Sequence, residues 1–452
     1  MLGKSIIAEI DKKQEQFEQL SMNIWENPEV AFEEKKACTL IAQFLQKEGF
    51  QVEIGYANLP TAIRAVWGGG KPVIGFLGEY DALPGMSQKV ATKKEPVIEN
   101  DPGQGCGHNL LGVAHVAAAI GLKKEMTEKN LPGTIIFYGC PAEETLIGKG
   151  LMAKEGAFEE IDMSFSWHPA PYNEVSTGRS VACNGVKFHF KGITAHAGGD
   201  PENGRSALDA AELMNVGTNY LREHVTDDVR FHYCYTDGGT VPNIVPDKAS
   251  VWYYVRALSR EAVNDAYERL IKVAKGAALM TETKVEVEFL GGCYNTLQNH
   301  VLLHTVHETM QEILLPEWTK EEIEFAKELN KTSANFNKMV ASGKINKDTH
   351  IDNVIPPITN NNWTASTDVG DVMHIAPGVF FMTTASNIGA AFHSWHITAS
   401  SGSSIGMKGM IYAGKIMAIS ALKAVENPII VEKAWKEFEK TMNGKTYECP
   451  LP

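Results

Sequence analysis

Cys106 and His108 lie two positions apart in a glycine-rich stretch, Gly-Gln-Gly-Cys-Gly-His-Asn, at positions 103–109. Thiolate and imidazole both suit divalent transition metals as ligands. The stretch runs directly into an apolar, Ala-rich segment that begins Leu-Leu-Gly-Val-Ala. Apolar residues on every side of a segment indicate a buried helix. The pair therefore suggests half of a metal site, although a structural cysteine beside a turn histidine is the ordinary alternative.

Further polar residues follow short apolar runs that are typical of buried strands. They are Asp81 after 73–77, Glu143 and Glu144 after 135–138, and His168 after 163–167. Strands that alternate with helices predict a largely parallel sheet covered on both faces. Ligands bind beyond the carboxyl ends of the strands in such sheets. We therefore expect these side chains to converge on the loop of Cys106 and His108.

The chemistry that this set favours is metal-assisted hydrolysis. Divalent ions can lower the pKa of a water toward neutrality and polarise an amide carbonyl. A carboxylate beside the ions can take the proton and return it to the leaving nitrogen. The adjacent Glu143 and Glu144 suit a division into one ligand and one base, although two surface glutamates after a strand are the ordinary alternative.

Length and composition restrict the class of protein. A chain of 452 residues is too long for one ordinary core and predicts two domains. The 42 basic and 55 acidic residues give a net charge of −13, which argues against a nucleic-acid or anionic-membrane partner. No stretch approaches the roughly 18 consecutive apolar residues of a membrane helix, and no signal-peptide core precedes residue 20. Seven scattered cysteines predict reduced thiols and a cytoplasmic location.

The pattern of elements changes at about residue 184. From there the expected order is β-α-β-β-α-β, which is that of a ferredoxin-like unit. We therefore predict an inserted α+β domain at 184–292. It divides an α/β domain into two parts, 1–183 and 293–452.

The chain is expected to return to the first domain after residue 292. Thr319 and Glu322 have the spacing of a capping box and predict the start of a helix. Residues 331–362, rich in Asn, Lys and Ser, predict an irregular excursion. A long terminal helix is expected at 407–425, and the Ala-Phe-His-Ser-Trp-His loop before it carries two histidines.

Six stretches resemble the motifs of the M20 peptidase family, in the branch that contains hippurate and auxin-conjugate hydrolases. They are Gly-Glu-Tyr-Asp-Ala-Leu-Pro at 78–84, Gly-Cys-Gly-His-Asn at 105–109, Cys-Pro-Ala-Glu-Glu at 140–144, Gly-Ile-Thr-Ala-His-Ala at 192–197, Ser-Thr-Asp-Val-Gly-Asp-Val at 366–372 and Phe-His-Ser-Trp at 392–395. They span nearly the whole chain in the family's order. The resemblance implies a zinc-exopeptidase-like catalytic domain and an inserted lid that dimerises.

Carried over by position, the resemblance implies five metal ligands: Cys106, His108, Glu144, His168 and His393. It also implies two ions per subunit, manganese or zinc, since a thiolate favours zinc and the other ligands accept manganese. Glu143 would be the general base, and Asp81 would orient a ligand. His396 is the alternative to His393 in the same loop.

Three residues of the inserted domain have implied roles as well. His196 would reach the active site of a neighbouring subunit, although a turn residue is the ordinary alternative. Asn243 and Arg256 would hold polar groups or a carboxylate of the substrate. An arginine that ends a strand is as often a surface charge.

The implied activity is hydrolysis of an N-acyl amino acid, with an aromatic acyl group, by a homodimer. A related second type of subunit is a further candidate partner. A dipeptidase or broader aminoacylase with the same metals is the alternative enzyme. A non-catalytic ligand-binding relative is the third alternative, and Glu143 argues against it because a binding protein needs no base.

Overall fold

The computed structural model describes residues 3–451 and divides them into two compact units. The first unit comprises the chain up to Gly178, Leu297–Asn362 and Asp371–Cys449, and the second comprises Arg179–Thr296 with Trp363–Gly370 and residues 450–451. The sequence-based division assigned all of 293–452 to the first domain. The segment 363–370 instead joins the second unit, because its backbone pairs there through Trp363 N to Arg179 O (2.8 Å) and Val181 N to Ala365 O (3.0 Å).

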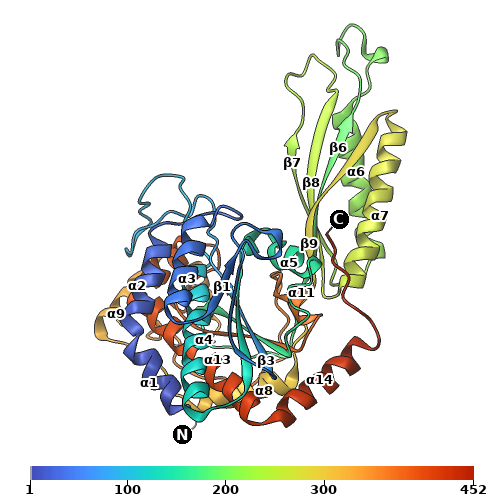
Figure 1. Ribbon diagram of the computed structural model, residues 1–452. Coiled ribbons are helices and arrows are strands. Elements are labelled where there is room, and N and C mark those ends of the chain that lie inside the picture. Colours follow the sequence, from blue (N-terminus) through green and yellow to red (C-terminus); the bar gives the residue numbers. More distant parts are fainter. Residues whose placement is uncertain (1–2, 452) are drawn as a thin grey trace. The chain divides into compact units, whose positions relative to one another are not determined.

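A six-stranded mixed sheet forms the centre of the first unit (Figure 1), in the order β1-β2-β4-β3-β5-β10. The strands are β1 (Gln51–Ile54), β2 (Ile63–Gly69), β3 (Val73–Glu79), β4 (Gly133–Cys140), β5 (Met163–Ala170) and β10 (Gly378–Thr384). The last four in the sheet order are parallel to one another, whereas β1 and β2 form an antiparallel edge that the sequence analysis did not identify. The mostly parallel α/β fold is as predicted.

Helices α4 (His108–Lys129) and α13 (Ser404–Glu426) pack against each other and against the sheet. The first fifteen residues of α4 are all buried, which confirms the buried helix after the Cys106 loop. Small residues permit this packing: a Cβ added to Gly112 would stand 2.5 Å from the carbonyl oxygen of Glu79. By length and composition alone α13 could cross a membrane, but 89% of its most apolar window is buried inside the protein. It is a core helix.

The remaining helices of the first unit differ from the sequence-based expectation in three places. They are α1 (Lys4–Lys12), α2 (Gln14–Trp25), α3 (Lys35–Lys47), α5 (Gly148–Lys154), α8 (His300–Glu312), α9 (Lys320–Lys331), α10 (Ala334–Ala341), α11 (Val369–Met373, which begins in residues of the second unit), α12 (Trp395–Ser401) and α14 (Pro428–Met442). The helix expected at 5–24 is two helices divided at Lys13. The irregular excursion contains α10, and α14 follows the expected terminal helix. The capping box of Thr319 and Glu322 is present.

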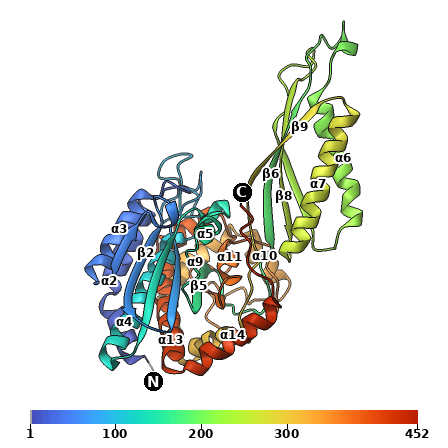
Figure 2. The same ribbon diagram turned by 45° about the vertical axis from the view of Figure 1, so that its right-hand side comes forward.

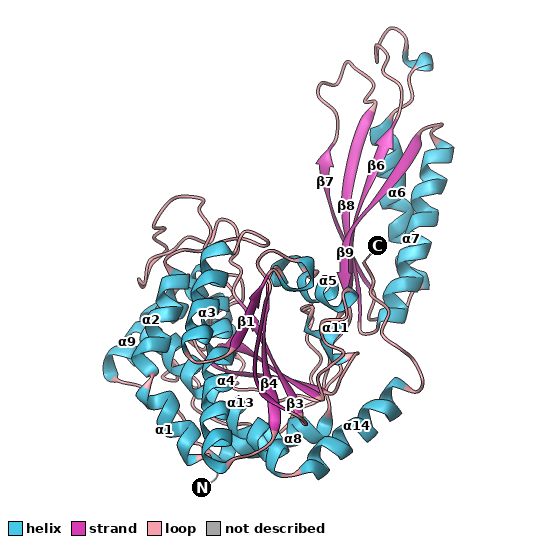
Figure 3. Cartoon of the chain, in the orientation of Figure 1, coloured by secondary structure: helices cyan, strands magenta, loops and turns pink. Residues whose placement is uncertain are grey.

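The second unit has the predicted β-α-β-β-α-β order. Its elements are β6 (Ala182–Lys191), α6 (Ala207–Leu221), β7 (Arg230–Asp237), β8 (Lys248–Ala257), α7 (Arg260–Met280) and β9 (Lys284–Cys293). The strands form an antiparallel sheet in the order β7-β8-β6-β9 (Figure 3). Figure 2 shows α6 and α7 side by side on one face of it. Alternate residues of β8 are buried, as expected for a sheet with one covered face.

Candidate metal centre

The candidate metal ligands of the first unit lie at the carboxyl ends of β4, β3, β5 and β10, which are neighbours in the sheet. Asp81 follows β3, Glu143 and Glu144 form a short turn after β4, His168 lies near the end of β5, and His393 lies between β10 and α12. Cys106 and His108 are at the amino end of α4. Loops far apart in the sequence meet here, as the parallel topology predicts.

Gly107 separates the two residues of the Cys-x-His pair and has to be a glycine. Its φ is +83°, and an added Cβ would stand 2.9 Å from Cγ of Pro169. Three other residues of the site loops have positive φ without being glycine: Ala142 (+59°), Leu146 (+61°) and His393 (+56°). Such conformations cost about 1–3 kcal/mol each and persist where the surrounding structure enforces them, often at functional sites. Three of the ten non-glycine residues with positive φ in the described part of the chain therefore lie in the loops that carry the candidate ligands.

Asp81 holds two of these loops together. One carboxylate oxygen lies 2.9 Å from Nδ1 of His108, and the other accepts a hydrogen bond from the backbone N–H of Glu144 at 2.9 Å. The contact on Nδ1 leaves Nε2 of His108 directed at the cluster, where it is buried without a hydrogen-bond partner among residues 3–451. This is the geometry in which a carboxylate orients a metal-binding histidine.

His168 is held in the same way by the backbone. Its Nδ1 lies 2.8 Å from the carbonyl oxygen of Pro169, which can only accept, so the proton is on Nδ1. Nε2 then offers a lone pair, and it lies 3.3 Å from Sγ of Cys106. Burial lowers the pKa of His168 to about 4, which keeps the ring neutral at pH 7. A neutral imidazole is the form that binds metal.

Glu144 and His393 complete the cluster on its exposed side. Nε2 of His393 lies 3.4 Å from a carboxylate oxygen of Glu144, and the His393 side chain is 52% exposed. His396 has other contacts, because its Nε2 lies 2.9 Å from Oγ1 of Thr332 and its ring stacks on Trp395. The structure therefore brings His393, and not His396, to the other candidate ligands.

The donor set fits a pair of divalent ions. Cys106, His108 and His168 form one group of ligand atoms within 4.8 Å of one another, and Cys106, Glu144 and His393 form a second that shares the cysteine sulfur. A third group consists of Glu79, His108 and Glu143. One carboxylate oxygen of Glu144 and Nε2 of His108 are buried without hydrogen bonds and lie 4.0 Å apart. Unpaired buried polar atoms are costly unless something binds them.

The pKa values of the acidic candidate ligands are raised in the metal-free protein, as expected for a site that a cation would stabilise. Burial raises the pKa of Glu144 to about 7, and neighbouring carboxylates contribute to the increase. Burial, together with the charge of Glu144, raises the pKa of the Cys106 thiol well above its usual value. A bound cation reverses this preference and favours thiolate and carboxylate.

Glu79 and Lys149 form a buried ion pair next to His108. The sequence analysis did not predict this pair. The Lys149 ammonium lies 2.5 Å from one oxygen of Glu79, and the other oxygen lies 3.5 Å from Nε2 of His108. Burial would raise the pKa of Glu79, but Lys149 and His108 lower it below its usual value. Glu79 is the last residue of the apolar strand β3, two positions before Asp81. That position at a strand end could have marked it as a candidate site residue. Nothing in the sequence around Lys149 shows that its side chain is buried.

The candidate substrate residues lie in the second unit. His196 and Asn243 are on two exposed loops that pair through Ala197 N and Asn243 O at 3.0 Å. Arg256 is partly buried in β8 and donates to Oγ of Ser366 at 3.2 Å, and its buried Nε has no hydrogen-bond partner in the described part of the chain. The structure thus brings His196 near Asn243 in their own unit.

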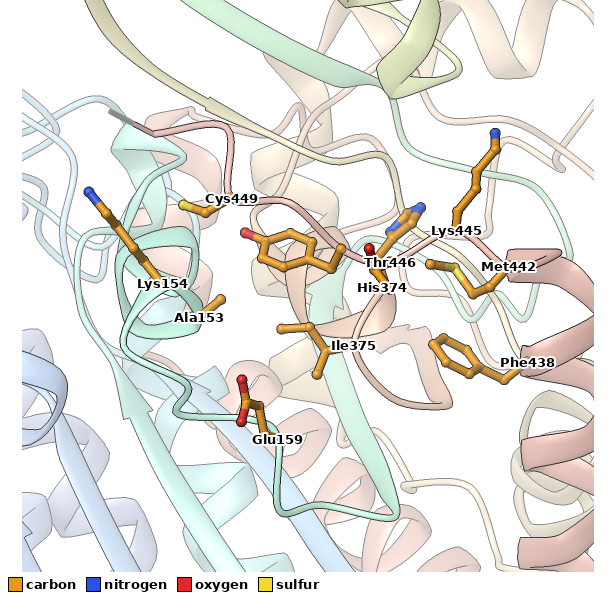
Figure 4. Close-up of a pocket in the computed structure, with 11 residues that line it drawn as sticks. Ala153, Lys154, Glu159, His374, Ile375, Phe438, Met442, Lys445, Thr446 and Cys449 are labelled. Carbon is orange, nitrogen blue, oxygen red and sulfur yellow. The ribbon is translucent and has the colours of Figure 1, made fainter.

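A pocket of about 420 Å³ lies elsewhere on the first unit, between α5, α14 and the segment that follows α14 (Figure 4). Phe438, Met442, Ile375 and Tyr447 supply apolar lining, and Lys154 and Lys445 are at its edge. It contains none of the candidate metal ligands. This pocket therefore does not mark the position of the candidate metal centre.

Comparisons with known proteins show that the chain is similar to hydrolases and peptidases. Residues 183–280 match the family model described as a peptidase dimerisation domain. The chain is 37% identical to the B-type chain of p-aminobenzoyl-glutamate hydrolase from Escherichia coli (strain K12), over 98% of this chain and 96% of that protein. It is 29% identical to the Xaa-Arg dipeptidase of Mus musculus, over 97% of this chain and 92% of that protein.

A solved structure has the same fold. It is the Bacillus subtilis protein described as a dinuclear metal binding peptidase from the M20 family, with a TM-score of 0.60 and 19% sequence identity. The alignment covers 92% of this chain and 99% of that one.

Proposed function

Because the chain belongs to the M20 family of peptidases and amidohydrolases, we propose that it hydrolyses the amide bond of an N-acyl amino acid with an aromatic acyl group. Aminobenzoyl-glutamate is the first substrate to test, because the E. coli relative is named for it. The observation that carries the proposal is the pair of ligand groups that share Cys106, with Glu143 beside them.

Two ions per subunit, manganese or zinc, are the proposed cofactors. The first group of residues to hold them is Cys106, His108 and His168, and the second is Cys106, Glu144 and His393. When bound, the ions would lower the pKa of a water and polarise the scissile carbonyl. Glu79 also lies near His108, but Lys149 already neutralises its charge. We therefore leave Glu79 out of the ligand set.

Glu143 is the proposed general base. Its side chain is 8% exposed, and one oxygen lies 3.8 Å from Nε2 of His108. In this position it can take a proton from the attacking water and deliver it to the leaving amide nitrogen. Asp81 is the proposed orienting residue, because its two oxygens fix the His108 ring and the backbone of Glu144.

The second unit supplies the proposed substrate contacts. Arg256 has a buried Nε without a hydrogen-bond partner, which would suit the α-carboxylate of an amino acid. Asn243 would hold a polar group of the substrate. His196 is exposed and would donate to the developing oxyanion in the site of a second subunit.

A homodimer through the second unit is the proposed assembly. The matched family domain is a dimerisation domain. Strand β7 is an edge of its sheet, and seven of its eight residues are exposed. On α6, Val216 and Tyr220 are exposed apolar side chains. Unpaired edges and apolar patches are surfaces that proteins cover by association. A related A-type chain is the alternative partner, since the name of the E. coli relative marks it as one of a lettered set of chains.

The cytoplasm is the proposed location. All seven cysteines lie within residues 3–451, and none of them is in a disulfide there. Reduced thiols suit a reducing compartment.

A release assay tests the activity. The purified protein is stripped with a chelator, reloaded with Mn²⁺ or Zn²⁺, and offered N-acyl amino acids and dipeptides while free amino acid is measured. We expect release from aromatic acyl substrates, and loss of release in the chelated protein. Faster hydrolysis of dipeptides with a C-terminal arginine would favour the second candidate, a dipeptidase like the mouse relative. Metal binding without hydrolysis of any substrate would favour a ligand-binding role.

A further inference from the structure

The loop that carries His393 connects β10 to α12 and has no helix or strand of its own. His393 is half exposed and has a φ of +56°. A left-handed backbone at a residue other than glycine persists only where the surrounding structure enforces it. Something outside the loop therefore has to fix its backbone.

The residues before His393 are bound by the end of α9. Oδ1 of Asn330 accepts hydrogen bonds from Nδ2 of Asn387 at 2.7 Å and from the backbone N–H of Gly389 at 3.1 Å. Ser333 donates from Oγ to the carbonyl oxygen of Gly389. The approach is so close that a Cβ on Gly389 would stand 2.6 Å from Cβ of Phe336 and 2.7 Å from the Asn330 oxygen. Asn330 is 1% exposed, so these bonds are shielded from water.

The residues after His393 are bound by the same segment. Oγ1 of Thr332 lies 2.9 Å from Nε2 of His396 and donates to the carbonyl oxygen of Leu329 at 3.0 Å. Since Thr332 donates its single hydroxyl proton to Leu329, its oxygen accepts the hydrogen bond from Nε2 of His396. Trp395 stacks on that ring with centroids 3.9 Å apart. Contacts on both sides of His393 thus come from residues 330–333.

Helix α9 and the residues that follow it are themselves fixed to the rest of the first unit. The capping box of Thr319 and Glu322 starts α9, and Glu322 pairs with Lys408 of α13 at 2.7 Å. At the other end, Asn330 donates from Nδ2 to the carbonyl oxygen of His350 at 3.1 Å. Because α9 is fixed to α13 in the core, its contacts can hold the His393 loop at a fixed position relative to the core.

We propose that the segment 319–341, which carries none of the candidate ligands, fixes the His393 loop, and that Asn330 and Thr332 are positioning residues for the ion that His393 binds. The inference rests on the proposed ligand role of His393. Groups that orient a metal ligand from behind typically change metal affinity about 10- to 100-fold when they are removed. The effect should be confined to the ion of the Cys106, Glu144 and His393 group.

Calorimetric titration of the metal-stripped protein with Mn²⁺ tests the proposal without reference to catalysis. The variants are Asn330→Ala and Thr332→Val, with Thr332→Ser as the conservative rescue and His393→Ala as the reference. Ser342→Ala is the matched control, because Ser342 is exposed just after the same segment and its side chain donates to a nearby backbone group, the carbonyl oxygen of Met339. Thermal unfolding of each metal-free variant is measured in parallel.

We expect Asn330→Ala and Thr332→Val to weaken one of the two binding steps about 10-fold or more, in the same step that His393→Ala weakens. Thr332→Ser and Ser342→Ala should bind both ions like the unmodified protein. A purely structural role would lower the unfolding temperature and leave both affinities unchanged, and that result overturns the inference. If His393→Ala itself leaves both steps unchanged, the proposed ligand set is wrong and the inference fails with it.

Discussion

Replacing Lys149 with methionine removes the cation from a pair that water does not reach. The Lys149 side chain is 0% exposed and that of Glu79 is 2% exposed, with 2.5 Å between ammonium and carboxylate. An exposed pair would contribute at most about 1 kcal/mol. Removing one partner of a buried pair leaves a charge without compensation and typically costs about 3–5 kcal/mol. We expect a loss of this size in the free energy of unfolding for Lys149→Met.

The assay is urea unfolding in the presence of a chelator, so that loss of bound metal does not contribute. The double variant Glu79→Gln, Lys149→Met removes both charges, and we expect it to be more stable than the single variant by most of that loss. Lys154→Met is the matched control, because Lys154 lies on the same helix and is exposed. A loss in Lys149→Met no larger than in Lys154→Met would refute the reasoning.

Three further outcomes are expected. Burial lowers the pKa of His115 to about 4 in the folded protein. In the unfolded chain this histidine takes up a proton below about pH 6.5, whereas in the folded protein it does so only near pH 4. Stability should therefore fall by about 2 kcal/mol between pH 7.5 and 5 through this residue, and His115→Leu should remove that part of the fall in urea unfolding. Blocking the α-carboxylate of the substrate as an amide should lower kcat/KM strongly, and equal cleavage of the blocked substrate would exclude a carboxylate role for Arg256. Dimers re-formed from a mixture of His196→Ala and Glu143→Ala should regain part of the activity if His196 acts across the interface, whereas two dead sites would place it in its own subunit.

The sequence predicted the elements whose patterns are local. The apolar runs before Asp81, Glu143 and His168 are β3, β4 and β5, and the capping box at Thr319 starts α9. Because parallel strands deliver their carboxyl ends to one edge, the convergence of these loops followed from the pattern alone.

Other features depended on tertiary contacts that no local pattern contains. The antiparallel edge β1 and β2 was missed, and the helix expected at 5–24 divides at Lys13 without a proline or glycine to mark the break. The burial of Lys149 depends on Glu79, seventy residues earlier in the chain. The residues 331–362 were predicted only as irregular, because contacts such as the hydrogen bond from Ser333 to the carbonyl oxygen of Gly389 join segments more than fifty residues apart.

The most direct measurement of the central claim is the metal content of Glu143→Ala and Glu144→Ala after stripping and reloading, with turnover measured on the same samples. A ligand and a base fail differently. We predict that Glu144→Ala loses metal, and that Glu143→Ala keeps the full metal content of the unmodified protein while turnover falls roughly 10²- to 10⁴-fold. Normal metal content in Glu144→Ala, or normal turnover in Glu143→Ala, would contradict the proposed site.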